Sequence, residues 1–442
     1  MKRTRILLVA AVAVAAIVVA LIGGVDAGPN SAARAAAPVS STDAAVLKEL
    51  LSGLAGNDTA RYVRGLERRL EMRPHDRDVV LLLGLAYEQR ARETGDPRFY
   101  TLAGRALAEA SGFAATRALA ETGLASLAVS RHRFETAIPL ARAALNADPS
   151  DATAYGALGD AYLNSGSYRR AFKAYDRMAE LSPSVASYGR VAHARELLGR
   201  PRAALEALRL ALTLPVPVRE HRAAGLVQLG NIELNMGDLA AAREAYRSAL
   251  AAVPGYVHAA AGLAHVEAES GDFRHALPQF RRAVDRLPLP QYAIWRGDAL
   301  RAAGLRAEAR RAYALVSFIG RVQAANGVRI DLQTALFDTD HGLRLAAAVQ
   351  HARAEFERAP SIDAADVLAW ALTRNGHCGE ALPYSVRALR LRTLDALKFF
   401  HRAAIERCLG DRNSARAWAR RAIAANPHFS LLWEPVARRW SR

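Results

Sequence analysis

Aromatic residues, lysine and cysteine are all scarce in this 442-residue sequence. Aromatic residues make up 7% of the chain and hydrophobic residues 51%, so alanine, leucine and valine have to build most of the core. Small aliphatic side chains suit close helix packing, and alanine favours helix formation more than any other residue. The composition predicts one large folded unit and excludes a long disordered tract.

Recognisable catalytic motifs are also missing. The sequence contains no nucleophile elbow, no phosphate-binding glycine loop, no paired zinc-ligand motif and no kinase-like signature. We therefore expect that the chain is not an enzyme and that it needs no cofactor, no metal and no small-molecule substrate. An envelope enzyme without a familiar motif ranks lowest among the alternatives.

Lysine occurs at four positions only, so arginine supplies nearly all of the positive charge behind a net charge of +17. A basic face would suit nucleic acid, anionic lipid or an acidic partner. The arginines are spread along the chain rather than clustered, which favours compositional bias over a binding face. RNA binding by a basic helical-repeat protein is kept as an alternative, although nucleic acid is not the partner that we expect.

The longest uncharged stretch lies near the N-terminus. Residues 1–5 are basic, residues 6–25 are apolar, and residues 26–42 are rich in Ala, Pro, Ser and Gly. Twenty apolar residues suffice to span a bilayer, which favours an uncleaved membrane anchor over a cleaved signal peptide. No cysteine follows the stretch, which excludes a lipoprotein anchor. Both interpretations place the body of the chain outside the cytoplasm of a bacterial cell envelope, behind a flexible tether.

A glycine followed five residues later by an alanine recurs through the rest of the chain. The glycines are Gly166, Gly199, Gly237, Gly271, Gly304, Gly342, Gly376 and Gly410. Another small residue precedes each glycine by seven positions: Gly159, Ala192, Gly230, Ala264, Gly297, Ala335, Ala369 and Ala403. Glycine just past a helix end takes the left-handed conformation without a steric penalty, and small residues let two helices approach closely. The pattern predicts a tandem array of helical hairpins, each stacked on its neighbours.

One unit shows the pattern most fully. Its markers are Tyr155, Leu158, Gly159, Tyr162, Ala171, Tyr175 and Pro183. These spacings resemble the tetratricopeptide repeat, with its W-x2-L-G-x2-Y, A-x3-F and P signature. The resemblance implies an all-α, right-handed α-solenoid of about eleven hairpins. We divide it into degenerate hairpins at 43–150, the main array at 151–427 and an amphipathic cap at 428–442.

The same resemblance implies that the first helix of each hairpin lines a concave groove where partners bind. The position after each small residue would face this groove, and it carries Asp160, His193, Asn231, His265, Asp298, Leu336 and Trp370. A polar ladder that ends in an apolar patch suits an extended peptide. The competing interpretation is an ordinary solvated helix face. We expect a membrane-tethered protein-interaction scaffold whose protein or peptide partner the sequence does not name.

Two smaller clusters have alternative interpretations. Asp338, Asp340 and His341 are potential metal ligands, but neighbours at this spacing on one helix end do not converge on one point, so a polar helix terminus is favoured. Cys378 and Cys408 lie in adjacent hairpins near one edge of the array. They could form a disulfide in an oxidising compartment, or they could be two small buried hydrophobic residues.

Overall fold

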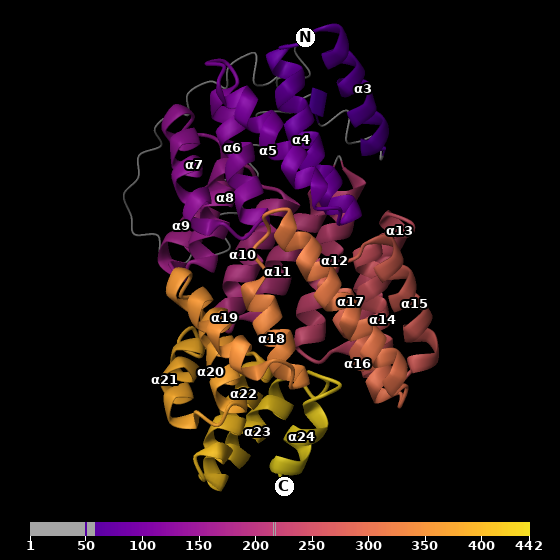
Figure 1. The fold of residues 1–442 in the computed structure, drawn as a ribbon, viewed down its shortest axis with the longest axis vertical. Coiled ribbons are helices and arrows are strands. Elements are labelled where there is room, and N and C mark those ends of the chain that lie inside the picture. Colours follow the sequence, from indigo (N-terminus) through magenta and orange to yellow (C-terminus); the bar gives the residue numbers. More distant parts are fainter. Residues whose placement is uncertain (1–48, 51–57, 215, 217) are drawn as a thin grey trace.

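The computed structural model describes residues 49–50, 58–214, 216 and 218–442. Within these residues, all of the regular structure is helical, in 22 helices from α3 to α24 (Figure 1). The expected all-α solenoid is confirmed for this part of the chain. The predicted anchor at 6–25 and the tether at 26–42 lie outside the described residues, as does most of the first expected helix at 43–55. No helix in the described part is long and apolar enough to cross a membrane.

Successive helices form antiparallel hairpins, and we number these from the first, whose second helix is α3 (Thr59–Met72). The second to sixth hairpins are α4 (Arg77–Thr94) with α5 (Arg98–Ser111), α6 (Arg117–Ser130) with α7 (Phe134–Ala147), α8 (Ala152–Asn164) with α9 (Tyr168–Leu181), α10 (Val185–Leu197) with α11 (Pro201–Thr213), and α12 (Arg219–Asn235) with α13 (Leu239–Ala252). The seventh to eleventh are α14 (Val257–Glu269) with α15 (Phe273–Arg286), α16 (Pro290–Ala302) with α17 (Arg306–Ala325), α18 (Asp331–His341) with α19 (Leu345–Arg358), α20 (Ile362–Arg374) with α21 (Cys378–Ala388), and α22 (Ala396–Cys408) with α23 (Arg412–Ala425). The last helix is α24 (Glu434–Trp440).

The recurrent glycines act as predicted. All eight lie between the two helices of a hairpin with φ between 68° and 91°, a conformation in which a side chain would be strained. In the third hairpin His132 takes the same position with φ 56°. Aspartates start many of the helices, as where Asp151 accepts hydrogen bonds from the backbone N–H groups of Thr153 and Ala154.

Successive turns of the superhelix contact each other, so that the turns of the second to sixth hairpins each meet a loop six hairpins further along (Figure 1). The turn of the fifth hairpin meets the loop before the eleventh, where the Thr393 hydroxyl donates to the Leu197 carbonyl at 2.6 Å. The turn of the sixth meets the chain after the eleventh, where the Asn426 side chain donates to the Leu234 carbonyl at 3.0 Å. Beside the turn of the fourth hairpin, the backbone N–H of Ile362 donates to the Tyr168 hydroxyl at 2.7 Å. We call this line of contacts the seam.

Two hairpins contain four more residues than their neighbours, and both extensions lengthen a helix. In the eighth hairpin α17 runs for 20 residues, and Gly327 follows it with φ 79°. The added turn extends the seam to the third hairpin, where the Arg131 guanidinium donates to the Asn326 carbonyl at 2.7 Å. The other extension precedes the sixth hairpin and gives α12 its 17 residues. Pro215 and Pro217, which precede this helix, lie outside the described residues.

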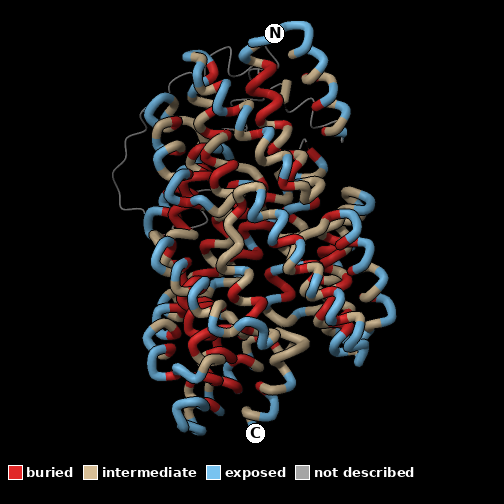
Figure 2. Tube along the Cα trace, in the orientation of Figure 1, coloured by how far each residue is buried: buried red, intermediate tan, exposed pale blue. Residues whose placement is uncertain are grey.

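The buried residues run as a continuous column through the stacked hairpins, with exposed residues on the outer helices (Figure 2). Alanine dominates this column at the helix crossings, including Ala171, Ala204, Ala242 and Ala276, none of which is exposed to solvent. In the segment predicted as a C-terminal cap, helix forms only from Glu434 to Trp440, and Phe429 to Trp433 is not helical.

Candidate partner-binding groove

Three of the predicted groove residues have a structural partner inside their own hairpin. Tyrosine hydroxyls donate from Tyr175 to Asp160, from Tyr246 to Asn231 and from Tyr313 to Asp298, at 2.9, 2.7 and 2.8 Å. The ring of each tyrosine occupies the space left by the preceding glycine. A Cβ at Gly159, Gly230 or Gly297 would lie only 2.4, 2.7 or 2.3 Å from that ring. The polar residue after the glycine therefore satisfies a hydroxyl that would otherwise be buried without a partner.

This pairing between the tyrosine hydroxyl and the polar residue was not predicted, although the sequence contains a pattern that indicates it. Wherever the small residue is glycine and a polar residue follows, a tyrosine occurs sixteen positions after the glycine. Where the small residue is Ala192, the corresponding position carries Leu208, which needs no hydrogen-bond partner. The size of one side chain is thus matched to the size of the other across the two helices of a hairpin.

A large cavity lies inside the first half of the superhelix. It has a volume of about 750 Å³ and is lined by the first helices of successive hairpins, from α4 to α14. Glu88, Arg92, Asp160, Arg190 and Glu220 supply its charges. We call this space the N-terminal cavity. Of the predicted groove residues, Asp160 lines it, while His193 lines a neighbouring hollow with Asp160 and Arg190.

The cations of the N-terminal cavity are paired. Arg190 forms an ion pair with Asp160 at 2.7 Å, and Arg92 forms one with Glu88 at 2.9 Å. Glu220 accepts a hydrogen bond from Gln89 at 2.8 Å, and burial raises the pKa of its carboxyl group. The cavity therefore presents a balanced mixture of both charges and apolar surface, not a continuous basic surface.

The second half of the groove holds the chain's own C-terminal segment, Phe429–Trp433. This segment lies against the first helices of the seventh to ninth hairpins, beside His265, Asp298 and Leu336. Trp370, predicted to line the groove, is covered by this segment. Trp370 is 2% exposed, because the ring of Trp433 meets it edge-on at 5.4 Å and His401 stacks on its other side at 4.5 Å.

The residues considered as metal ligands point to different partners. The Asp340 carboxylate accepts from the indole nitrogens of both Trp370 and Trp433, at 2.9 and 3.0 Å. His341 contacts Asp298 at 2.8 Å, whereas Asp338 pairs with Arg344. Burial raises the pKa of Asp340. Burial also lowers the pKa of His341, but its contact with Asp298 outweighs this and leaves the pKa above the ordinary value.

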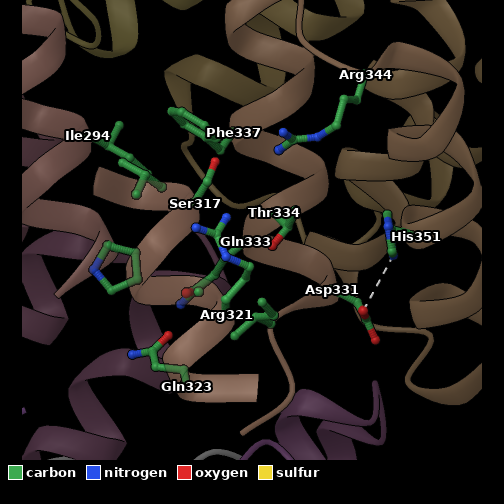
Figure 3. Close-up of a pocket in the computed structure, with 14 residues that line it drawn as sticks. Ile294, Ser317, Arg321, Gln323, Asp331, Gln333, Thr334, Phe337, Arg344 and His351 are labelled. Atoms are coloured by element: carbon green, nitrogen blue, oxygen red, sulfur yellow. Dashed lines mark ion pairs between the residues drawn. The ribbon is translucent and has the colours of Figure 1, made fainter. Parts of the chain in front are cut away.

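A smaller cavity of about 290 Å³ is lined by residues of α16, α17, α18 and α19 (Figure 3). Ile294 and Phe337 form its apolar wall, and Arg321 and Asp331 lie at its edge. Asp331 is within 3.4 Å of His351. None of the residues around this cavity was predicted from the sequence to belong to a binding site.

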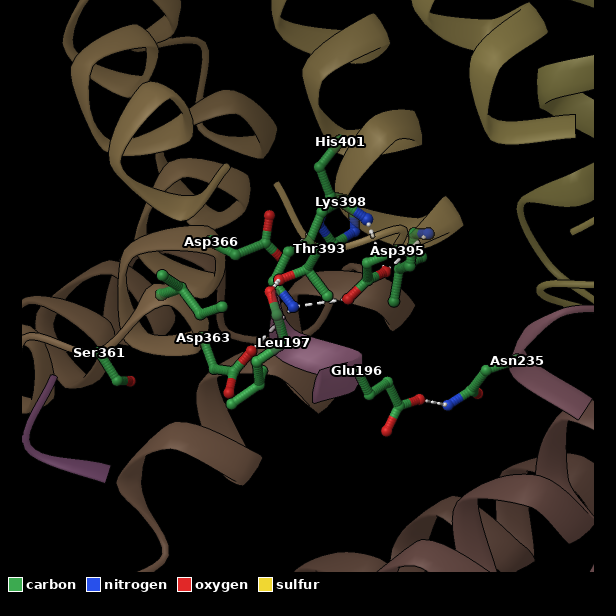
Figure 4. A network of polar contacts seen from close by, with 12 residues as sticks. Glu196, Leu197, Asn235, Ser361, Asp363, Asp366, Thr393, Asp395, Lys398 and His401 are labelled. Atoms are coloured by element: carbon green, nitrogen blue, oxygen red, sulfur yellow. Dashed lines mark hydrogen bonds and ion pairs between the residues drawn. The ribbon is translucent and has the colours of Figure 1, made fainter. Parts of the chain in front are cut away.

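A buried charge cluster supports the seam beside the groove (Figure 4). The Lys398 ammonium lies 2.8 Å from Asp363 and 2.5 Å from Asp395, and His401 contacts Asp366 at 2.9 Å. Burial lowers the pKa of Lys398, but the surrounding carboxylates outweigh burial and hold it well above 10.5. A hollow of about 340 Å³ next to this cluster is lined by His193.

The repeat units match a known family. The family model for the tetratricopeptide repeat matches residues 122–186, 192–257, 227–272 and 261–317. The chain is a tetratricopeptide repeat protein. A segment of 133 residues, 30% of this protein, is 34% identical to mouse Superkiller complex protein 3 and 32% identical to the human protein. The segment covers only 8% of either relative.

Solved structures with similar folds include other helical-repeat proteins. One is PilW, described as a type IV pilus biogenesis factor, at 20% identity and a TM-score of 0.38, covering 50% of this chain and 98% of PilW. Another is a monomeric mutant of IFIT1, at 12% identity and a TM-score of 0.44, covering 86% of this chain and 89% of that one. At such TM-scores these likenesses carry no argument about function.

The two cysteines of this tetratricopeptide repeat protein form a disulfide in the structure. Cys378 begins α21 and Cys408 ends α22, and their Cα atoms are 6.0 Å apart. This distance lies within the range that a disulfide requires. The bridge links the tenth and eleventh hairpins.

Proposed function

We propose that this tetratricopeptide repeat protein is a protein-interaction scaffold that binds a polypeptide segment in its N-terminal cavity. The observation that carries the proposal is the cavity itself, a space of about 750 Å³ lined by six successive first helices. Repeats that present equivalent side chains along a groove suit a ligand with a regular backbone, and an extended peptide is such a ligand.

The charges of the cavity favour a polypeptide over a nucleic acid. A nucleic-acid channel needs a run of unpaired cations along the phosphate backbone. Here Arg92 and Arg190 are already neutralised by Glu88 and Asp160, and Glu220 adds a further acid. A peptide with apolar side chains and both kinds of charge would match these walls, whereas RNA would find both guanidinium groups already paired and would meet a further acid at Glu220.

The location that we propose is the exported face of a membrane. The support comes from the apolar stretch at 6–25 behind a basic flank and from the disulfide, since disulfides persist in oxidising compartments. N-terminal sequencing of protein recovered from the membrane fraction tests this. A mature protein that begins at Met1 or Lys2, with its body on the exported side of the bilayer, supports the anchor. Free cysteines in the cytoplasm would react with a membrane-impermeant thiol reagent only after cell lysis and without prior reduction. Labelling of that kind would contradict the proposed location.

Site-specific photo-crosslinking tests the binding site. Ala224 lines the N-terminal cavity, and Ala240 is an exposed alanine on the outer helix of the same hairpin. A benzoylphenylalanine at position 224 should crosslink to a polypeptide that position 240 does not capture. Glu220→Lys should then reduce the yield of that crosslink by about tenfold. Equal capture from both positions, or crosslinks to RNA at position 224, would contradict the proposal.

A further inference from the structure

The chain after α23 leaves the helical stack and enters the groove. Phe429–Trp433 runs past α18 towards α16 before α24 begins, as the yellow stretch of Figure 1 shows. Leu431 packs against a buried cluster that includes Ala264 and Ala299, as does Trp295. These contacts belong to the first helices of the seventh and eighth hairpins, the helices that line the groove.

Trp433 anchors the other end of the segment. Its indole nitrogen donates to Asp340 at 3.0 Å, and its ring stacks on Phe400 with centroids 5.5 Å apart. The Arg374 guanidinium lies over the rings of both Trp433 and Trp370, 5.2 and 5.3 Å from their centroids. An aromatic anchor in a pocket with one buried hydrogen bond is the usual composition of a peptide-binding hot spot.

The fit of the segment is incomplete. Leu431, Leu432 and Trp433 all remain partly exposed. A space of about 280 Å³ is left beside them, next to His265 and Asp298. Segments that belong permanently to a core are packed without such voids, because unfilled volume forfeits contacts on both sides. A segment held by two anchors across a partly empty groove is poised to be displaced.

We propose that the groove formed by α14, α16, α18 and α20 is a second polypeptide-binding site, which takes a peptide carrying leucine two residues before tryptophan. The chain's own Phe429–Trp433 is the internal competitor for that peptide. This second site rests on the proposed function in one respect, that the ligand is a polypeptide. It differs in its position, in the second half of the superhelix, and in requiring leucine and tryptophan side chains on the ligand.

A labelled peptide with the sequence of residues 427–433 tests the proposal. The tethered segment competes at a high effective concentration, so the free peptide should bind the unaltered protein weakly. Leu431→Asp removes the apolar contact of the segment and should tighten peptide binding at least tenfold. The matched control is Leu409→Asp, which makes the same change at a leucine that is 44% exposed and distant from the groove. It should leave peptide binding unchanged.

A third variant identifies where the peptide binds. Leu336 lies on α18 under the segment, so the double variant Leu431→Asp/Leu336→Asp should lose the gained affinity. Peptide affinity that is the same in the unaltered protein and in a folded Leu431→Asp variant would overturn the proposal. Binding that persists in the double variant would overturn it as well.

Hydrogen exchange on the unaltered protein gives an answer even if Leu431→Asp does not fold. Saturating peptide should accelerate exchange at the backbone amides of residues 430–433, while the amides of α22 stay protected. Unchanged exchange in that segment would refute displacement. The result is separable from the proposed function, because crosslinking at position 224 reports on the N-terminal cavity alone.

Discussion

The buried ammonium group of Lys398 compensates the negative charges of Asp363 and Asp395. Lys398 is 8% exposed, and Asp363 and Asp395 lie within 3 Å of its ammonium group. Removing one partner of a buried ion pair leaves the other charge without compensation. The stability lost in this way is larger than the net stability that the intact pair contributes. The same cluster lies against the seam, so its loss would affect two turns of the superhelix together.

We expect Lys398→Met to lower the free energy of unfolding by about 1–3 kcal/mol, because Asp363 and Asp395 keep part of their contact with solvent. Denaturation with urea, followed by circular dichroism, measures this. Lys173→Met is the control, because Lys173 is exposed on α9 and its replacement should change stability by less than about 0.5 kcal/mol. A Lys398→Met variant as stable as the control would show that the cluster is not a stabilising element.

Asp176 makes the stability of the protein depend on pH. Burial, with a smaller contribution from Glu180, raises the pKa of its carboxyl group from 3.8 to about 6. Because the folded-state pKa lies above the unfolded one, folding favours the protonated form. Its contribution to stability is fully present below about pH 4 and is lost as the pH rises through about 6.

Asp176→Asn should therefore raise the free energy of unfolding at pH 7 by about 1 kcal/mol, allowing for the partial exposure of the side chain. At pH 4 the substitution should have almost no effect, since aspartic acid is then largely neutral in the folded protein. Paired urea titrations at the two pH values measure the difference. A gain of the same size at both would show that burial of the charge is not its cause.

At the scale of the helical hairpin, the fit of glycine to tyrosine decides how closely two helices approach. The fourth hairpin combines Gly159 with Tyr175, and the fifth combines Ala192 with Leu208 at the corresponding positions. Both combinations fill the same space between the two helices. In the fourth hairpin the tyrosine supplies nearly all of the volume, whereas in the fifth the alanine and the leucine share it. Small changes of volume in a close-packed interface alter stability measurably.

Gly159→Ala should lower the free energy of unfolding by about 2–3 kcal/mol, since its Cβ would lie 2.4 Å from the Tyr175 ring. Tyr175→Leu alone should also destabilise, by leaving a void beside Gly159 and by removing one hydrogen bond from Asp160, which stays paired with Arg190. The double variant copies the fifth hairpin, so it should be more stable than the sum of the two single effects implies. A double-mutant cycle gives the coupling energy directly, and strictly additive effects would contradict the volume match.

Individual hairpins could be predicted from the sequence because their determinants are local. The glycines at the turns and the small residues at the crossings act within some 35 residues of chain, which a repeat pattern displays. The C-terminal segment could not be predicted in this way. Leu431, Leu432 and Trp433 fit an amphipathic helix, yet the groove offers Trp433 a buried acceptor at Asp340, more than ninety residues earlier.

At the scale of the whole molecule, the seam changes the behaviour expected of a repeat array. In an open solenoid each unit contacts only its neighbours, so one hairpin can unfold without the rest. Here the third to sixth hairpins also contact chain that follows them by nearly two hundred residues. The register of the seam arises from small rotations summed over six hairpins, which no single repeat encodes. The seam should therefore couple the two halves of the superhelix during unfolding.

Two glycines with the same conformation separate the effect of the seam from that of the turn. Gly199 has φ 71° and Gly376 has φ 82°. A Cβ at Gly199 would lie 2.4 Å from the backbone oxygen of Arg392, whereas a Cβ at Gly376 would meet nothing within 4 Å. Gly376→Ala should lower the free energy of unfolding by about 1 kcal/mol through backbone strain alone. Gly199→Ala should lower it by about 3–4 kcal/mol, because the two turns must also move apart. Hydrogen exchange should show the added loss at residues 390–395 as well as at the fifth hairpin, and equal destabilisation by the two variants would mean that the seam contributes nothing.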